Sequence, residues 1–255
     1  MILDLIITTA ALSLIIGLRY LGVAWLFHAV LWKGRGRGRA LTRAPQRARM
    51  RREIVASLIA CPIYALPAAL VIELWKRGGT AMYADVAAHP LWWLPLSAVI
   101  YLLAHDAYYY VVHRALHHPR VFPWAHAEHH RSREPSAFAS FAFDPVEAAA
   151  TAWFLPALTL IIPIHVGVAL GLLTLMTLTA VLNHAGREVW PEAWLRRAPL
   201  RWLITATHHD QHHRRFTANY GLYFRFWDQW LGTEAADRPA RPRPSTATHE
   251  ATEAS

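Results

Sequence analysis

Long apolar stretches constrain this 255-residue chain more than any other feature of its sequence. They occupy residues 1–32, 54–75, 91–112 and 146–182. At a rise of about 1.5 Å per residue, each is long enough as a helix to cross a hydrocarbon core of about 30 Å. Charged residues make up only 17% of the chain, against roughly 25% in soluble domains. We therefore expect an all-α integral membrane bundle with about four to five spans.

The fourth stretch, residues 146–182, is too long for one span and is interrupted at Pro163. It predicts a tight helical hairpin, which could be re-entrant. Cys61 is the single cysteine, so an internal disulfide is excluded. The expected organisation is an N-terminal transmembrane segment (1–32), a basic linker (33–53), a main domain (54–233) and a disordered tail (234–255) rich in Pro, Ala, Thr and Ser.

The basic residues between the first two apolar stretches set the expected orientation. The net charge is +9, and much of it lies in this juxtamembrane position, which the positive-inside rule places on the cytoplasmic face. A cleavable signal peptide is the alternative for residues 1–32, but it would have a basic start and a shorter apolar run. Nucleic acid binding is not expected, because no basic patch with interleaved aromatic residues occurs inside a soluble domain. The basic residues are Lys33, Arg35, Arg37, Arg39, Arg43, Arg47, Arg49, Arg51 and Arg52.

Histidine is concentrated in two short segments, 105–130 and 184–213, which hold 12 of the 16 histidines. Each segment contains an H-x-x-H-H motif, and the first also contains H-x-x-x-H. Only roughly 0.06 H-x-x-H-H matches are expected by chance at this histidine frequency. Positions i, i+3 and i+4 share one face of a helix, so each motif can aim three imidazoles at one point. The motif histidines are His113, His117, His126, His129, His130, His209, His212 and His213.

Eight imidazoles predict a two-metal centre, because they are too many for one tetrahedral ion. Imidazole suits Zn, Cu, Fe and Ni, whereas Mg and Ca prefer oxygen ligands. With the basic linker inside, both histidine segments are expected in a helical cap on the cytoplasmic face.

At these residues the sequence resembles the membrane fatty acid hydroxylase and sterol desaturase superfamily of non-haem di-iron oxygenases, and the C-5 sterol desaturases in particular. The resemblance rests on HRALHH, HAEHH and HDQHH, with HDAYYYVVHR, NYG and WDQWLGT around them. It covers about residues 50–233 and implies that 54–233 is the catalytic domain. It also implies that the eight histidines hold two iron ions, with His184 of NHAGRE as a further ligand or else a helix-end cap. Asp144 of FDPVE departs from the pattern, since relatives often have histidine before that proline.

Three other histidines are possible ligands with weaker support. His118 and His208 each lie about 100° around a helix from a motif histidine. His105 precedes His113 by eight residues, which is about 12 Å along a helix. The simpler expectation is that His118 and His208 lie near the metals or on the surface, and that His105 lines a substrate path or pairs inside the membrane.

A stripe of helical spacing joins Asp106 and Tyr110 to the first two motif histidines. Because ligating imidazoles usually donate their second N–H to an acceptor, Asp106 and Tyr110 are candidate supports for the ligands. The alternative is that Asp106 pairs with an arginine and Tyr110 simply packs. Asp210 and Asp228 are similar candidates, while Asn219 and Gly221 are expected to shape a turn.

The sequence as a whole predicts an enzyme that uses O2 to hydroxylate or desaturate a C–H bond of a lipid, either fatty acyl or sterol-like. Iron is favoured over zinc because this chemistry needs a redox-active metal. The reaction also needs an external electron donor, such as a ferredoxin, a cytochrome b5-like protein or a reductase. Basic residues of the cap could dock that donor or contact anionic lipid headgroups. The Arg-rich, Lys-poor composition suggests a bacterial inner membrane.

Two other functions remain open at this point. A zinc-dependent membrane hydrolase would need a general base such as Glu128 or Glu134, and neither lies in an H-E-x-x-H frame. A metal transporter, or a metal-binding protein without catalysis, would spread ionisable residues through several spans, whereas the motif histidines collect at one end.

Overall fold

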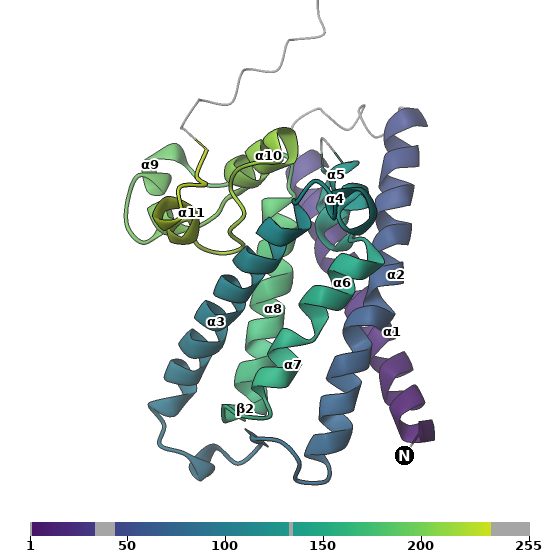
Figure 1. Ribbon diagram of the computed structural model, residues 1–255, viewed down its shortest axis with the longest axis vertical. Coiled ribbons are helices and arrows are strands. Elements are labelled where there is room, and N and C mark those ends of the chain that lie inside the picture. The colour runs from purple at the N-terminus through teal and green to yellow at the C-terminus, as the bar shows by residue number, and fades with distance from the viewer. Residues whose placement is uncertain (1, 34–43, 133–134, 236–255) are drawn as a thin grey trace, which may run out of the picture.

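Four long helices form the body of the computed structural model, which describes residues 2–33, 44–132 and 135–235. They are α1 (Ile2–Lys33), α2 (Ala44–Trp75), α3 (Trp93–Leu116) and α8 (Val166–Asn183). These helices lie side by side and run between the same two ends of the molecule (Figure 1). The expected all-α bundle is therefore confirmed.

The shorter elements gather mainly at one end of this bundle. Helices α4, α5, α9, α10 and α11 cover that end, whereas β2 lies at the opposite end (Figure 1). Strands β1 and β2 pair in parallel, with Met82 opposite Ile164. The short elements are β1 (Met82–Tyr83), η2 (Val86–Ala88), α4 (Phe122–Ala125), α5 (Ala127–His130), η3 (Ala137–Phe141), α6 (Pro145–Ala152), α7 (Phe154–Leu158), β2 (Ile164–His165), α9 (Glu192–Leu195), η4 (Leu200–Trp202), α10 (Ala206–Arg215) and α11 (Phe226–Trp230).

Three helices are long and apolar enough to cross a membrane, over Ile2–Val30, Arg47–Trp75 and Val166–Asn183. Large apolar side chains point outward from them, and Ile6 and Leu14 of α1 are both more than half exposed. Such a surface suits a lipid solvent and would be a liability in water. The predicted span at 91–112 corresponds to α3, which is long enough to cross a membrane but is not one of the three helices that are also apolar enough. Its composition is more polar because it carries histidine, aspartate and several tyrosines.

The predicted hairpin at 146–182 is present, with unequal arms. Helices α6 and α7 form one arm, the chain turns at Pro163 and β2, and α8 returns as the other. The hydroxyl of Tyr101 in α3 donates to the carbonyl of Ile162 at 2.7 Å, which ties the turn to the neighbouring helix. Only the α8 arm is long and apolar enough to span.

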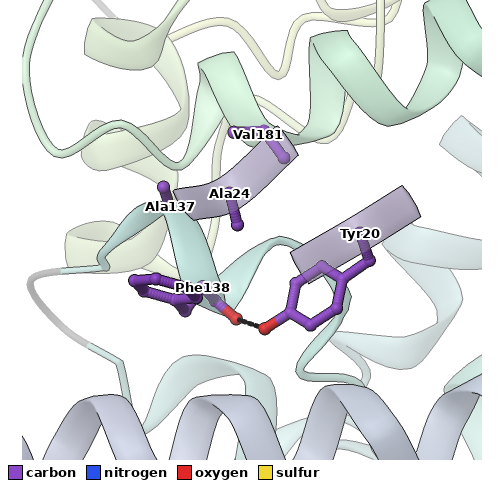
Figure 2. Close-up of a cluster of buried hydrophobic side chains, with 5 residues drawn as sticks. All are labelled: Tyr20, Ala24, Ala137, Phe138 and Val181. Carbon is purple, nitrogen blue, oxygen red and sulfur yellow. Dashed lines mark hydrogen bonds between the residues drawn. The ribbon is translucent and has the colours of Figure 1, made fainter. Parts of the chain in front are cut away.

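Helix α1 packs against the segment that follows the first H-x-x-H-H motif. Figure 2 shows Tyr20 and Ala24 of α1 beside Ala137 and Phe138 of η3 and Val181 of α8. The Tyr20 hydroxyl donates to the Phe138 carbonyl at 2.7 Å. The small alanines let the backbones approach closely, so the helix ends near the histidines are held together by packing.

The basic linker expected at 33–53 is helical from Ala44, where α2 begins. Arginine and alanine are good helix formers, so the Arg-rich stretch extends the apolar helix by nearly three turns. Residues 34–43 of that linker and 236–255 of the predicted disordered tail lie outside the described residues.

Candidate metal centre

Histidines from four parts of the chain meet at the covered end of the bundle. His113 lies in the last turn of α3, and His117 caps that helix. His126 precedes α5, which carries His129 and His130. Helix α10 brings His209, His212 and His213, and His184 caps α8. The structure thus brings together all eight motif histidines and His184.

The nine imidazoles form two groups in which all ligand atoms lie within 4.8 Å of one another. We call them the five-histidine group (His113, His117, His126, His130 and His212) and the four-histidine group (His129, His184, His209 and His213). Both groups are almost entirely buried. Each group could hold a metal ion.

Each H-x-x-H-H motif is divided between the groups, although the spacing had suggested that all three imidazoles aim at one point. His126 and His130 lie in the five-histidine group, while His129 lies in the other. In α10, His209 and His213 both lie in the four-histidine group, whereas His212 lies in the five-histidine group. Successive residues of a helix are about 100° apart, so positions i+3 and i+4 diverge by that angle and can serve two ions.

Hydrogen bonds at Nδ1 orient most of these rings. A carbonyl oxygen can only accept, so a ring whose Nδ1 meets a carbonyl holds its proton there and leaves Nε2 unprotonated. His126 differs, because its Nδ1 lies 2.7 Å from a carboxylate oxygen of Glu147. The carbonyl partners are Tyr220 for His113 (2.9 Å), Ala142 for His129 (3.3 Å), Ala180 for His184 (2.8 Å) and Ala218 for His212 (2.7 Å).

The Nε2 atoms face one another at close range. Those of His113 and His126 are 3.1 Å apart, and those of His184 and His209 are 2.9 Å apart. With Glu147 ionised, the rings of the first pair both carry their proton on Nδ1, so two Nε2 lone pairs meet with no proton between them. A cation would remove this repulsion, and nitrogens about 2.1 Å from one ion lie about 3.0 to 3.4 Å apart. The residues present therefore fit metal ions.

Burial keeps the imidazoles in the neutral form that metal binding requires. Loss of solvation, with repulsion from neighbouring histidines, lowers the pKa of His117 to about 3. Burial alone lowers the pKa of His184 to about 4. The same causes hold the pKa values of His129 and His212 well below 6.5.

Asp106 and Asp228 support the site one step away from the imidazoles. Asp106 accepts hydrogen bonds from the backbone N–H of Leu222 and Tyr223 and from the Trp227 indole, at 3.2, 2.8 and 2.8 Å. Asp228 accepts from the two preceding amides, those of Tyr220 and Gly221, both at 2.8 Å.

These two carboxylates therefore bind the four consecutive amides of residues 220–223. The Tyr220 carbonyl, which lies between the two amides bound by Asp228, accepts the Nδ1 proton of His113. Asp106 contacts the backbone of this segment and the Trp227 indole, and none of these hydrogen bonds is to a motif histidine. A Cβ at Gly221 would lie 2.6 Å from the Phe224 carbonyl, so only glycine fits this turn. Asn219 has a positive φ of 59°, which agrees with the expected turn.

The remaining candidates lie outside both groups. The Tyr110 hydroxyl bonds to Thr233 at 2.8 Å, and Asp210 pairs with Arg214 at 2.9 Å. The hydrogen-bond partner of Tyr110 and the ion-pair partner of Asp210 are therefore not motif histidines.

The three weaker histidine candidates also lie elsewhere. His105 bonds to the Tyr223 hydroxyl, two turns along α3 from His113. His118 is exposed, and His208 bonds to Thr205 on the adjacent face of α10. His118 and His208 point about 100° away from a neighbouring motif histidine around the helix axis, and His105 lies about two turns from His113. All three therefore lie outside both groups.

Sequence reasoning missed Glu147. It is 1% exposed and contacts His126 from α6, 21 residues further along the chain. One signal was available, because Asp144 and Glu147 are the only acidic residues between 135 and 187. An ionisable residue in so apolar a stretch is costly to bury and often functional. Asp144 itself accepts from the Glu128 amide at 2.8 Å and so holds the start of α5.

Comparisons with known proteins agree with this geometry. A family model described as fatty acid hydroxylase matches residues 98–233. The lathosterol oxidase of Mus musculus is 34% identical over 185 residues, which cover 71% of this chain and 60% of that protein. The human lathosterol oxidase is 31% identical over 76% of this chain and 64% of its own length. The Delta(7)-sterol 5(6)-desaturase ERG3B of Gibberella zeae is 28% identical over 74% of this chain and 57% of its own length.

The chain spans about three fifths of the length of these curated relatives. No solved structure matches it.

Proposed function

The chain belongs to the fatty acid hydroxylase family, and from this premise we propose that it is a non-haem di-iron membrane enzyme. It would use O2 to desaturate or hydroxylate a C–H bond of a lipid. The names of the similar sterol oxidases and desaturases favour a sterol-like substrate over a fatty acyl chain. The catalytic domain would be 54–233, preceded by the transmembrane segment 1–32 and the linker 33–53 and followed by the tail 234–255.

The observation that carries this proposal is the pair of buried histidine groups with their Nε2 atoms turned inward. The five-histidine group would hold one iron and the four-histidine group the other. When bound, iron would supply the redox chemistry that O2 needs to attack an unactivated C–H bond, which zinc cannot supply. The surrounding fold keeps the imidazoles neutral, fixes their orientation and excludes water.

The position of the histidines suits a substrate that arrives from the bilayer. The groups lie where the apolar helices end, so a lipid that stays in the hydrocarbon region could bring a carbon to them. Exposed tryptophans mark the same end, with Trp124 in α4 at 59% exposure and Trp230 in α11 at 71%. Tryptophan favours membrane–water interfaces, which supports placing this end at the bilayer surface.

Orientation and electron supply complete the proposal. The basic residues before and within the start of α2 favour a cytoplasmic location for the histidine end, in a bacterial inner membrane. Electrons would come from a ferredoxin, a cytochrome b5-like protein or a reductase. An acidic donor could dock on the exposed arginines of the cap, which also suit anionic headgroups. These arginines include Arg120, Arg197, Arg201 and Arg215.

The two alternative functions gain no support from the geometry. Glu128, the general base considered for a zinc hydrolase, is paired with Arg131 at 2.6 Å and with Arg52 at 3.3 Å. Glu134, the other candidate, lies outside the described residues. A transporter would place metal-binding groups along the spans, whereas both described histidine groups lie at one end.

Lipid profiling tests the proposed reaction. Cells that express the chain should accumulate a lipid that has lost two hydrogens or gained one oxygen, and growth without O2 should prevent this change. The matched control is the His212→Ala variant, which should leave the lipid profile of the host unchanged. An identical profile for the wild-type chain and this variant, with sterol and fatty acyl precursors both supplied, would contradict the proposal.

A further inference from the structure

His126 is supported differently from the other oriented histidines. Its Nδ1 lies 2.7 Å from Oε2 of Glu147, with both side chains at 0 to 1% exposure. The four other rings with an assigned Nδ1 partner meet backbone carbonyls. Among the described residues, this is the one hydrogen bond between a carboxylate and a histidine of either group. A carboxylate therefore touches the five-histidine group alone.

Burying the Glu147 carboxylate costs free energy of folding. It stands in the first turn of α6, between α2 and the histidines, where it cannot reach water. Its second oxygen, Oε1, is buried and has no hydrogen-bond partner. A buried, half-satisfied carboxylate destabilises a fold relative to an apolar residue of the same shape. Stability alone therefore does not account for Glu147.

The contact has a defined effect on the ring. With Glu147 ionised, the carboxylate accepts the Nδ1 proton of His126, so the lone pair at Nε2 points to His113 and the centre of the group. A carboxylate partner also makes an imidazole a stronger ligand than a carbonyl partner does. Such supporting groups change metal affinity by about 10- to 100-fold when removed.

We infer that Glu147 is a positioning residue that acts through His126 and strengthens metal binding in the five-histidine group selectively. The inference rests on the proposed function in one respect, that both groups bind metal ions. It predicts two metal positions of unequal sensitivity: replacing the carboxylate weakens one and leaves the other unchanged.

Cobalt binding tests this inference without any need for turnover. The full chain, purified in detergent and stripped of metal, is titrated with Co²⁺ alone in competition with a chelator, and the two bound ions are followed by absorbance. Wild-type protein should bind two Co²⁺. In Glu147→Gln, one of the two affinities should fall by about 10- to 100-fold.

A matched control separates this effect from the loss of any buried carboxylate. Glu73 of α2 is also buried, at 7% exposure, and it bonds to Thr8 and Lys76 at the far end of the helix. Glu73→Gln should leave both Co²⁺ affinities at their wild-type values. A purely structural role for Glu147 would instead weaken both positions together, in step with a lower thermal midpoint of the metal-free protein.

The His126→Asn background tests whether Glu147 acts through the ring. Adding Glu147→Gln there should not lower Co²⁺ affinity further, because the only hydrogen bond of the carboxyl group with the five-histidine group, in the described part of the chain, is to the His126 ring. Equal affinities in wild type and Glu147→Gln would overturn the inference, as would an undiminished loss in the His126→Asn background. Failure of Glu147→Gln to fold in both backgrounds would do the same. If wild-type protein binds no Co²⁺ at all, the proposed function fails first.

Discussion

The two histidine groups use one kind of side chain but are supported in different ways. In the five-histidine group two ring contacts are long-range, that of His113 with the Tyr220 carbonyl and that of His126 with Glu147, while His212 bonds to the Ala218 carbonyl six residues away. In the four-histidine group, His184 bonds to Ala180 within its own helix end, and His129 bonds to Ala142. The first group should therefore respond more to changes far from it in sequence, and the second more to the end of α8.

Removing a ligand from either group should have the largest effect. His212→Ala deletes a buried imidazole of the five-histidine group, and His209→Ala deletes one of the four-histidine group. Each should abolish lipid oxidation and lower the metal content from two ions toward one. Activity assays and metal analysis on the purified variants check this. Full activity in either variant would show that the ring is not a ligand.

Acidification should destabilise the metal-free protein strongly. The pKa of His184 is about 4 in the folded protein, against about 6.5 when unfolded. The unfolded state therefore binds more protons below pH 6.5, so stability is fully present above that pH and is lost as pH falls toward 4. Each such histidine contributes up to about 1.4 kcal/mol per pH unit.

Thermal midpoints of the metal-free protein between pH 7.5 and 4.5 measure this effect. Bound metal should resist it until the ions dissociate, so the metal-loaded protein should hold its midpoint to lower pH. A flat profile for the metal-free protein would mean that the histidines are not buried in the neutral form.

Replacing Asp106 should affect the two groups unequally. Asp106→Ala leaves the amides of Leu222 and Tyr223 and the Trp227 indole without their acceptor, at a cost of about 2 to 4 kcal/mol in the free energy of unfolding. Because these amides fix the segment that holds His113, the five-histidine group should lose metal first. Chemical denaturation and Co²⁺ titration measure the two effects.

Asp85 provides the control for that change. It is exposed at the other end of the bundle and caps η2 through the Ala87 amide. Asp85→Ala should cost no more than about 1 kcal/mol and should leave both metal affinities unchanged. Equal metal loss from both groups in Asp106→Ala would contradict the idea that Asp106 acts on His113 through the segment that contains Tyr220.

The smallest effect is expected at the histidines outside the groups. His118 is exposed, and its Nδ1 accepts only from the nearby Arg120 amide. His118→Ala should change stability by less than about 0.5 kcal/mol and leave metal content at the wild-type value. His184→Ala should in contrast remove metal from the four-histidine group. Similar metal losses in the two variants would contradict the assignment of His184, but not His118, to a metal-binding group.

Much of the fold and the site could be predicted because both depend on local periodicity. Apolar stretches of sufficient length gave the long helices, and the H-x-x-H-H spacing placed its histidines on helix faces that meet. His184 was expected only through family resemblance, since a lone histidine at a helix end carries no spacing signal. The beginning of α2 at Ala44 was missed because the apolar pattern starts later than the helix.

The pairing of ligands could not be read from the motifs. His129 and His130 are neighbours in sequence but lie in different groups, and so do His212 and His213. Their assignment depends on how α5 and α10 are rotated about their axes, which tertiary packing decides. The contacts of Glu147 with His126 and of Asp106 with the 222–223 amides are likewise tertiary, and residue spacing alone does not encode them.

Metal analysis of the full chain, purified from iron-replete cells without added metal, tests the central claim most directly. The two-group arrangement predicts two iron ions per chain, with iron lost from one position in His212→Ala and from the other in His209→Ala. Protein that carries only zinc, or that holds a single ion unaffected by either substitution, would contradict a di-iron centre built from these nine histidines.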